Sequence, residues 1–95
     1  MPKGYCIVRV DVHNPEAYAL YAKDATEAIK KHGGRPLVRG GAYEAMEGQA
    51  RARNVVLEFD SVEAARAFYL SEDYQSAKKK REYAATVEYV IVEGV

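Results

Sequence analysis

The stretch GYCIVRVDV, at residues 4–12, decides the fold expected for this chain. Every second side chain along it is a cysteine or a valine, at positions 6, 8, 10 and 12. The side chains between them are mixed in character. Because successive side chains of a strand point to opposite faces of a sheet, this alternation predicts a strand with one apolar face.

A helix is expected directly after this strand. Asn14 is a good N-cap, Pro15 suits the first helical position, and Glu16 suits the positive end of a helix. Apolar side chains then recur at helical spacing as far as Ile29. The basic run at residues 30–32 favours the C-terminal end of the helix dipole, and the two glycines after it supply a left-handed stop.

Two further strands and a turn are expected in the middle of the chain. Residues 35–43 predict a second strand, which Gly40 and Gly41 interrupt by a bulge or a close approach of another group to the backbone. Residues 47–50 predict a turn or a hairpin loop, and residues 54–60 (NVVLEFD) predict a third strand.

The last third of the chain predicts a broken helix and a final strand. Asp60 is expected to cap the helix, with Glu63 reaching back in a capping box. A second set of capping residues at 71–73 predicts a break near Leu70. A second helical piece would then carry Tyr74, Ala77 and Arg81 inward, and residues 86–93 (TVEYVIVE) predict the last strand.

This order of elements is the split βαβ arrangement of ferredoxin-like domains. We therefore expect one α+β domain over residues 1–95, with a four-stranded antiparallel sheet. Right-handed crossovers would place the helices on one face of that sheet.

The other sheet face is expected to need a partner. It is predicted to mix charged with apolar side chains, namely Tyr5, Ile7, Arg9, Asp11, Val56, Glu58, Val87, Tyr89 and Ile91. An apolar patch of this size marks an interaction surface, and a mixed face suits a lined cavity. We therefore expect a homodimer joined through the sheet face, with a cavity at that face.

Composition excludes several classes of function. The 14 basic and 14 acidic residues cancel, so a nucleic-acid partner is not expected. No apolar run is long enough to span a membrane, and the single cysteine, Cys6, has no disulfide partner or zinc-ligand set around it. These features predict a cytoplasmic protein without a metal, and no nucleotide-binding fingerprint indicates a cofactor.

The chain resembles domain of unknown function family 1330. The stretches that carry the resemblance are GYCIVRVDVHNPEAYALYA, HGGRPLVRGG, RNVVLEFDSVEAARAFYLSEDYQ and the final YVIVEG. The family is similar to the dimeric α/β-barrel superfamily, in which two ferredoxin-like sheets pack face to face. That superfamily includes muconolactone isomerases and antibiotic-biosynthesis monooxygenases. The resemblance implies the dimer and leaves the reaction open, since one fold hosts many activities.

The residues predicted to bind a ligand are led by Arg39, beside the bare backbone of Gly40 and Gly41. Its guanidinium could hold a carboxylate or an enolate, or it could form an ion pair with Glu58 or Asp11 across the sheet. The other predicted ligand-binding residues are Arg9, Glu58, Tyr21 and Tyr74. The two tyrosines could equally be large amphipathic core side chains.

The candidates for acid–base chemistry are His13, His32, Tyr18 and Tyr69. Histidine titrates near neutral pH, and a tyrosine hydroxyl can act as a hydrogen-bond donor or an acid. The alternative for His32 is a favourable charge at a helix end, and for His13 an idle place in a turn.

The leading hypothesis is a homodimer that binds a small, anionic organic molecule in a barrel cavity. Such a protein could be a cofactor-free isomerase or a monooxygenase-like enzyme. The alternative is a non-catalytic ligand-binding or accessory module of the same fold. The sequence alone leaves open whether the protein is an enzyme.

Overall fold

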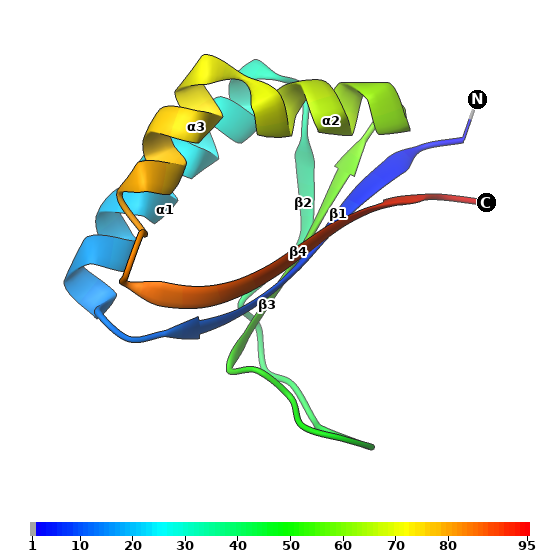
Figure 1. The fold of residues 1–95 in the computed structure, drawn as a ribbon. Helices are drawn as coiled ribbons and strands as arrows, with labels where there is room; N and C mark the ends of the chain where they lie inside the picture. The colour runs from blue at the N-terminus through cyan, green and yellow to red at the C-terminus, as the bar shows by residue number, and fades with distance from the viewer. Residues whose placement is uncertain (1) are drawn as a thin grey trace.

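Three helices pack on one face of a four-stranded antiparallel sheet in the computed structural model, which describes residues 2–95 (Figure 1). The elements follow in the order β1 (Gly4–Val12), α1 (Pro15–Lys31), β2 (Arg35–Arg39), β3 (Arg53–Phe59), α2 (Val62–Leu70), α3 (Glu72–Lys79) and β4 (Ala85–Glu93). The strands lie in the order β2-β3-β1-β4. The predicted ferredoxin-like α+β fold is confirmed, with the second helical region in two pieces.

The ends of α1 are as predicted. The Asn14 side chain accepts a hydrogen bond from the Ala17 amide at 3.2 Å, and Pro15 occupies the first turn. At the other end Gly33 has a φ of 79°, which lets the Gly34 amide return to the Ile29 carbonyl at 2.9 Å. Only glycine adopts this left-handed conformation without strain.

The predicted cap of α2 is wrong by one residue. Ser61, not Asp60, is the N-cap, and its hydroxyl accepts from the Ala64 amide at 3.0 Å. Asp60 is exposed and pairs instead with Arg35, so Asp60 and Glu63 form no capping box. The predicted break near Leu70 is confirmed, because Ser71 ends α2 and also caps α3.

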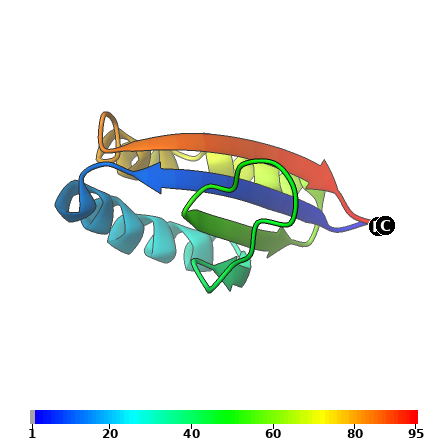
Figure 2. The same ribbon diagram turned by 90° about the horizontal axis from the view of Figure 1, so that it is seen from below.

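Strand β2 ends at Arg39 and does not continue to residue 43 as predicted. Gly40 has a φ of 72°, which turns the chain out of the sheet. The residues from 40 to 52 then form a long loop on the side away from the helices (Figures 1 and 2). The register irregularity lies between Pro36 and Val38, so the bulge precedes the glycines.

The core lies between the helices and the sheet. Cys6, Phe59, Phe68 and Ala65 are fully buried there, and the Phe59 and Phe68 rings lie 5.1 Å apart. Each large apolar side chain buried in this way contributes roughly 1.5–3 kcal/mol to the free energy of unfolding.

The predicted faces of the last strand are reversed. In the β1–β4 pairing, Val10 lies opposite Val87, Val8 opposite Tyr89, and Cys6 opposite Ile91. Directly paired residues share a face, so these three β4 residues point toward the helices and pack against the core. Their placement on the opposite face was wrong, because the parity of β4 depends on a register that its own sequence does not reveal.

The sheet face away from the helices, here called the open face, carries ion pairs around exposed valines. Arg35 contacts Glu58 at 2.9 Å, and Arg51 contacts Glu88 at 3.0 Å. Val90 is 53% and Val92 43% exposed on this face. The loop from 40 to 52 crosses the same face, where the Gln49 carbonyl accepts from Arg9 (Figure 2).

Candidate functional site

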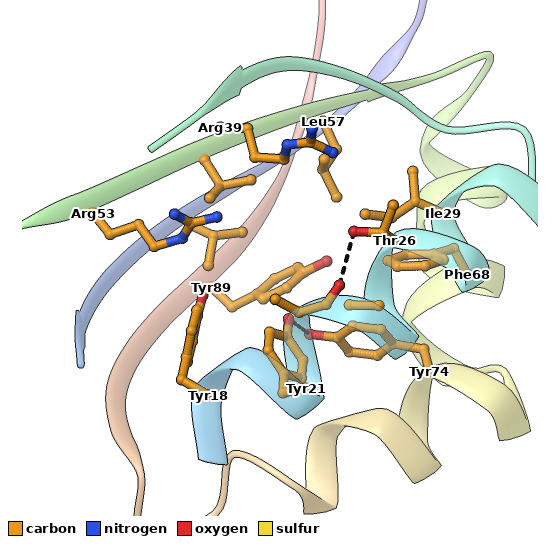
Figure 3. A pocket seen from close by; sticks show the side chains of 14 residues that line it. Tyr18, Tyr21, Thr26, Ile29, Arg39, Arg53, Leu57, Phe68, Tyr74 and Tyr89 are labelled. Carbon is orange, nitrogen blue, oxygen red and sulfur yellow. Dashed lines mark hydrogen bonds between the residues drawn. The ribbon is translucent and has the colours of Figure 1, made fainter. Parts of the chain in front are cut away.

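A pocket lies between α1 and the helix-facing side of the sheet (Figure 3). The cavity itself is narrow, about 50 Å³, and widens to about 490 Å³ of empty space when its open mouth is counted. A single water needs about 10–15 Å³ of a volume measured like the smaller of these two values. The pocket therefore has room for a few waters or one small, flat molecule. Its lining residues are Val8, Tyr18, Tyr21, Ala22, Ala25, Thr26, Ile29, Arg39, Arg53, Val55, Leu57, Phe68, Tyr74 and Tyr89.

Aromatic rings form much of the pocket wall. Tyr18 and Tyr21 project from one side of α1 with ring centroids 5.2 Å apart. Tyr74 from α3 meets Tyr21 edge-on at 6.2 Å, and the Tyr89 ring from β4 lies 6.2 Å from Tyr74. Flat apolar walls of this kind favour a planar ligand.

Two guanidinium groups stand at the sheet side of the pocket. Arg39 ends β2 and pairs with Val55, which places its side chain on the helix-facing side of the sheet. Arg53 begins β3 opposite Val10 and shares that face. In Figure 3 both side chains extend over the tyrosines, and the Arg53 guanidinium lies 5.6 Å from the Tyr18 ring centroid.

Gly40 makes room for Arg53. A Cβ atom at position 40 would lie 2.3 Å from Arg53 Nη1, and the backbone there is already left-handed. The predicted close approach at the paired glycines is therefore an arginine side chain that passes over Gly40. Gly41 has no such neighbour.

The pocket is positively charged. Its lining contains two arginines and no aspartate, glutamate or lysine. Among residues 2–95, Arg39, Arg53 and the nearby Arg81 form no salt bridge, whereas Arg9, Arg35 and Arg51 on the open face each contact a carboxylate. An unneutralised pair of guanidiniums beside apolar walls attracts an anion.

The tyrosine hydroxyls of the pocket stay protonated at neutral pH. Burial raises the pKa of Tyr21 and Tyr74, and the Tyr21 and Tyr74 hydroxyls lie 2.8 Å apart. Burial also raises the pKa of Tyr89, and that of Tyr18. The Tyr89 hydroxyl is buried beside the Cys6 thiol and forms no hydrogen bond with an oxygen or nitrogen atom among residues 2–95. These groups can donate hydrogen bonds but cannot serve as bases.

The structure brings together some of the predicted ligand-binding residues and separates others. Arg39, Tyr21 and Tyr74 line one pocket. Arg9 and Glu58 lie on the open face, where Arg9 contacts Glu88 at 3.3 Å and Glu58 accepts from Tyr5 at 3.0 Å. The alternative ion pair of Arg39 with Glu58 or Asp11 does not form, because those carboxylates are on the opposite face and contact Arg35 and Arg51.

Of the predicted acid–base residues, only Tyr18 lines the pocket. His13 is exposed beyond β1, with Nε2 at 2.7 Å from the Thr86 hydroxyl. His32 caps α1 and lies 3.1 Å from Asp73. Tyr69, on α2, packs against the Tyr89 ring at 4.9 Å, and Lys78 Nζ lies 5.4 Å from the Tyr69 ring centroid.

Tyr89 is the pocket residue that sequence reasoning missed, since it was assigned to the wrong face of β4. The face on which Tyr89 lies is decided by the register between β1 and β4, in which Tyr89 is opposite Val8. Arg53 also lines the pocket and was not among the predicted site residues.

No cluster of three or more histidine, cysteine, aspartate or glutamate side chains that could hold a metal ion occurs within residues 2–95. In the same range, no helix is both long and apolar enough to cross a membrane.

The fold defines a class. The helix-backed sheet places the chain among ferredoxin-like α+β proteins, and its solved relatives share this fold. Within that class it belongs to the family Domain of unknown function (DUF1330), whose model matches residues 3–95. None of the curated proteins compared matches the chain.

Three solved structures illustrate the fold. A protein of unknown function from Rhodopseudomonas palustris is 19% identical, with a TM-score of 0.80 over 99% of this chain and 83% of that one. SnoaB, a cofactor-independent oxygenase from Streptomyces nogalater, is 14% identical, with a TM-score of 0.71 over 97% and 92%. A dimeric ferredoxin-like protein of unknown function from Thermobifida fusca is 13% identical, with a TM-score of 0.57 over 97% and 91%.

Proposed function

We propose that this protein binds a small, planar organic anion in the pocket between α1 and the sheet. The observation that carries the proposal is the contrast in charge between the two sheet faces. Open-face arginines contact carboxylates, whereas Arg39 and Arg53 at the pocket contact none among residues 2–95. The anionic group of the ligand would lie at Arg39 and Arg53, and its flat body between the tyrosine rings.

The side chains that line the pocket limit the types of reaction that it could catalyse. No imidazole or carboxylate is among the lining residues, and the tyrosines have raised pKa values. An isomerisation that needs a protein base therefore fits poorly. A ligand that ionises by itself and then reacts with oxygen fits better, and SnoaB, a cofactor-independent oxygenase, has the same fold. The same absence of a base supports the alternative, a non-catalytic ligand-binding module.

We also propose that two copies pair through the open face. Ile7, Val38, Val90 and Val92 are exposed there, at 37–53% of their surface. The charged residues around them already pair within one chain, so burial would leave few charges unpaired. The protein from Thermobifida fusca, which is dimeric and shares the fold, supports self-association.

The ligand site is tested by measuring the binding of benzoylformate and of phenylacetate by isothermal titration calorimetry. We expect Arg39→Gln and Arg53→Gln each to weaken binding by about tenfold or more, because a charge-assisted hydrogen bond is lost. Arg66→Gln, which changes an exposed arginine of α2, is the matched control. Equal binding by all three variants would refute the site.

Turnover separates the two candidate functions. Oxygen uptake and changes in the ligand's absorbance are followed after binding is established. Consumption of a bound anion in air, with none under nitrogen, supports the oxygenase. Binding without consumption under either condition supports the ligand-binding module.

A further inference from the structure

Three polar side chains, those of Arg81, Tyr74 and Tyr21, are linked by hydrogen bonds at the pocket. Arg81 is not itself a lining residue. Arg81 Nη2 donates to the Tyr74 hydroxyl at 3.5 Å, and the Tyr74 and Tyr21 hydroxyls lie 2.8 Å apart. The guanidinium carbon of Arg81 lies 5.2 Å from the Tyr21 ring centroid. Figure 3 shows the Tyr21 and Tyr74 hydroxyls meeting at the pocket, below Tyr89.

The direction of this chain follows from the chemistry of arginine. A guanidinium has only donors, so Tyr74 Oη must accept from Arg81. Tyr74 is 1% exposed, and within residues 2–95 the Tyr21 oxygen is the only acceptor at hydrogen-bond distance from the Tyr74 hydroxyl. A hydrogen bond from Tyr74 to Tyr21 satisfies both, whereas the reverse direction would leave the buried Tyr74 proton unpaired. The Tyr21 proton is then free to turn into the pocket.

The pocket contains a second buried hydroxyl. Tyr89 Oη lies beside the Cys6 thiol and forms no hydrogen bond with an oxygen or nitrogen atom among residues 2–95, and the Tyr89 side chain points toward the middle of the pocket in Figure 3. Burial is the first cause of the raised pKa of both Tyr21 and Tyr89, so both phenols remain neutral donors. A buried donor without a partner costs free energy unless a ligand or a water accepts from it.

We propose that Tyr21 is a ligand-binding residue that donates a hydrogen bond to a carbonyl or enolate oxygen of the bound anion, and that Arg81, acting through Tyr74, is the positioning residue that turns the Tyr21 proton toward it. The inference rests on the proposed function and names its ligand class. The ligand is an anion that carries its charge at Arg39 and Arg53 and a carbonyl oxygen deeper in the pocket.

A matched pair of ligands isolates this contact. Benzoylformate and phenylacetate share a phenyl ring and a carboxylate, and differ only in that benzoylformate has a keto group where phenylacetate has a methylene group. We expect the wild-type protein to bind benzoylformate about five- to tenfold more tightly in calorimetry, the worth of one hydrogen bond. In Tyr21→Phe this ratio falls toward one while the affinity for phenylacetate is kept. Tyr43→Phe, on the exposed loop, is the control and keeps the wild-type ratio.

Three further variants test the positioning role of Arg81. Arg81→Met removes the donor and the charge but keeps an unbranched side chain, and it lowers the benzoylformate ratio. Arg81→Lys restores a donor and recovers part of the ratio. Tyr74→Phe breaks the same chain without removing the cation, and gives the same loss. A purely structural role would lower the affinity for both ligands alike and leave the ratio unchanged.

The outcomes separate the two levels of the proposal. If the wild type binds both ligands and Tyr21→Phe leaves the ratio unchanged, the Tyr21 contact is refuted and the anion site stands. If Arg81→Met and Tyr74→Phe leave the ratio unchanged while Tyr21→Phe abolishes it, the role of Arg81 is refuted. If the wild type binds neither ligand, the proposed function fails and this inference fails with it.

Discussion

Arg53 Nη1 lies where a side chain at Gly40 would have to be. A Cβ built at Gly40 falls 2.3 Å from that nitrogen, and the Gly40 φ of 72° disfavours any other residue. The glycine that ends β2 therefore also holds open the path of the Arg53 side chain to the pocket.

Gly40→Ala is expected to damage both stability and binding. The left-handed backbone costs an alanine about 1–2 kcal/mol, and the displaced Arg53 leaves the ligand site. Chemical denaturation measures the first effect and calorimetry with benzoylformate the second. Gly41→Ala is the control, since nothing lies within 4 Å of a Cβ there. Equal behaviour of the two variants would contradict the role assigned to Gly40.

The Asp73 carboxylate is expected to stabilise the fold except in acid. The hydrogen bond from His32 is the main cause that lowers the Asp73 pKa to about 2, from a usual 3.8. A lowered folded-state pKa means that the stabilisation is present above pH 3.8 and is lost as the pH falls toward 2. In urea titrations, Asp73→Asn should be less stable than the wild type near pH 6 and equal to it near pH 2.

The partner of Asp73 provides the control for that experiment. In a His32→Gln background, the cost of Asp73→Asn near pH 6 should shrink, because the two side chains act as one pair. An unchanged cost would show that Asp73 stabilises the start of α3 through other groups, such as Ser71.

Self-association is expected to depend on the open face. The wild type should have twice the 10.6 kDa mass of one chain in light scattering. Val90→Asp should yield monomers, because each lost apolar contact is worth about 1.5–3 kcal/mol and the change appears twice in a symmetric dimer. Leu20→Asp, on the exposed side of α1, should leave the mass unchanged. A wild-type monomer at high concentration would overturn the proposed pairing.

The core cluster around Phe68 is expected to dominate stability. Phe68 is fully buried, and its ring lies 5.1 Å from Phe59 and 4.7 Å from Tyr74. Phe68→Ala should cost about 3–5 kcal/mol in urea denaturation, since a large cavity remains. Leu70→Ala, two residues further on but 65% exposed, should cost far less. Similar costs for both would contradict the packing described.

Local signals made most of the fold predictable. Alternation in β1, the Asn14 cap and the Gly33 stop of α1 each depend on neighbours within a few residues, and each was confirmed. The faces of β4 were not predictable from its own sequence. TVEYVIVE has bulky apolar side chains on both parities, so only its pairing with β1 decides which set meets the helices.

The candidate site was predictable only in part for the same reason. Tyr21 and Tyr74 were found because their helical spacing placed them on inner faces, and Arg39 because of the glycines beside it. Arg9 and Glu58 were grouped with them on the expectation that the cavity lay on the open face. Their pairing with Glu88 and Arg35 neutralises them there, which local sequence could not reveal.

The distribution of aromatic residues makes the pocket visible in solution. The chain has eight tyrosines and no tryptophan, and four of those tyrosines line the pocket. The ultraviolet emission of the protein therefore comes from tyrosine alone, and half of its emitters stand where a ligand would bind. Occupancy can be followed through the intrinsic fluorescence of the unlabelled protein, and Tyr→Phe variants would assign the signal ring by ring.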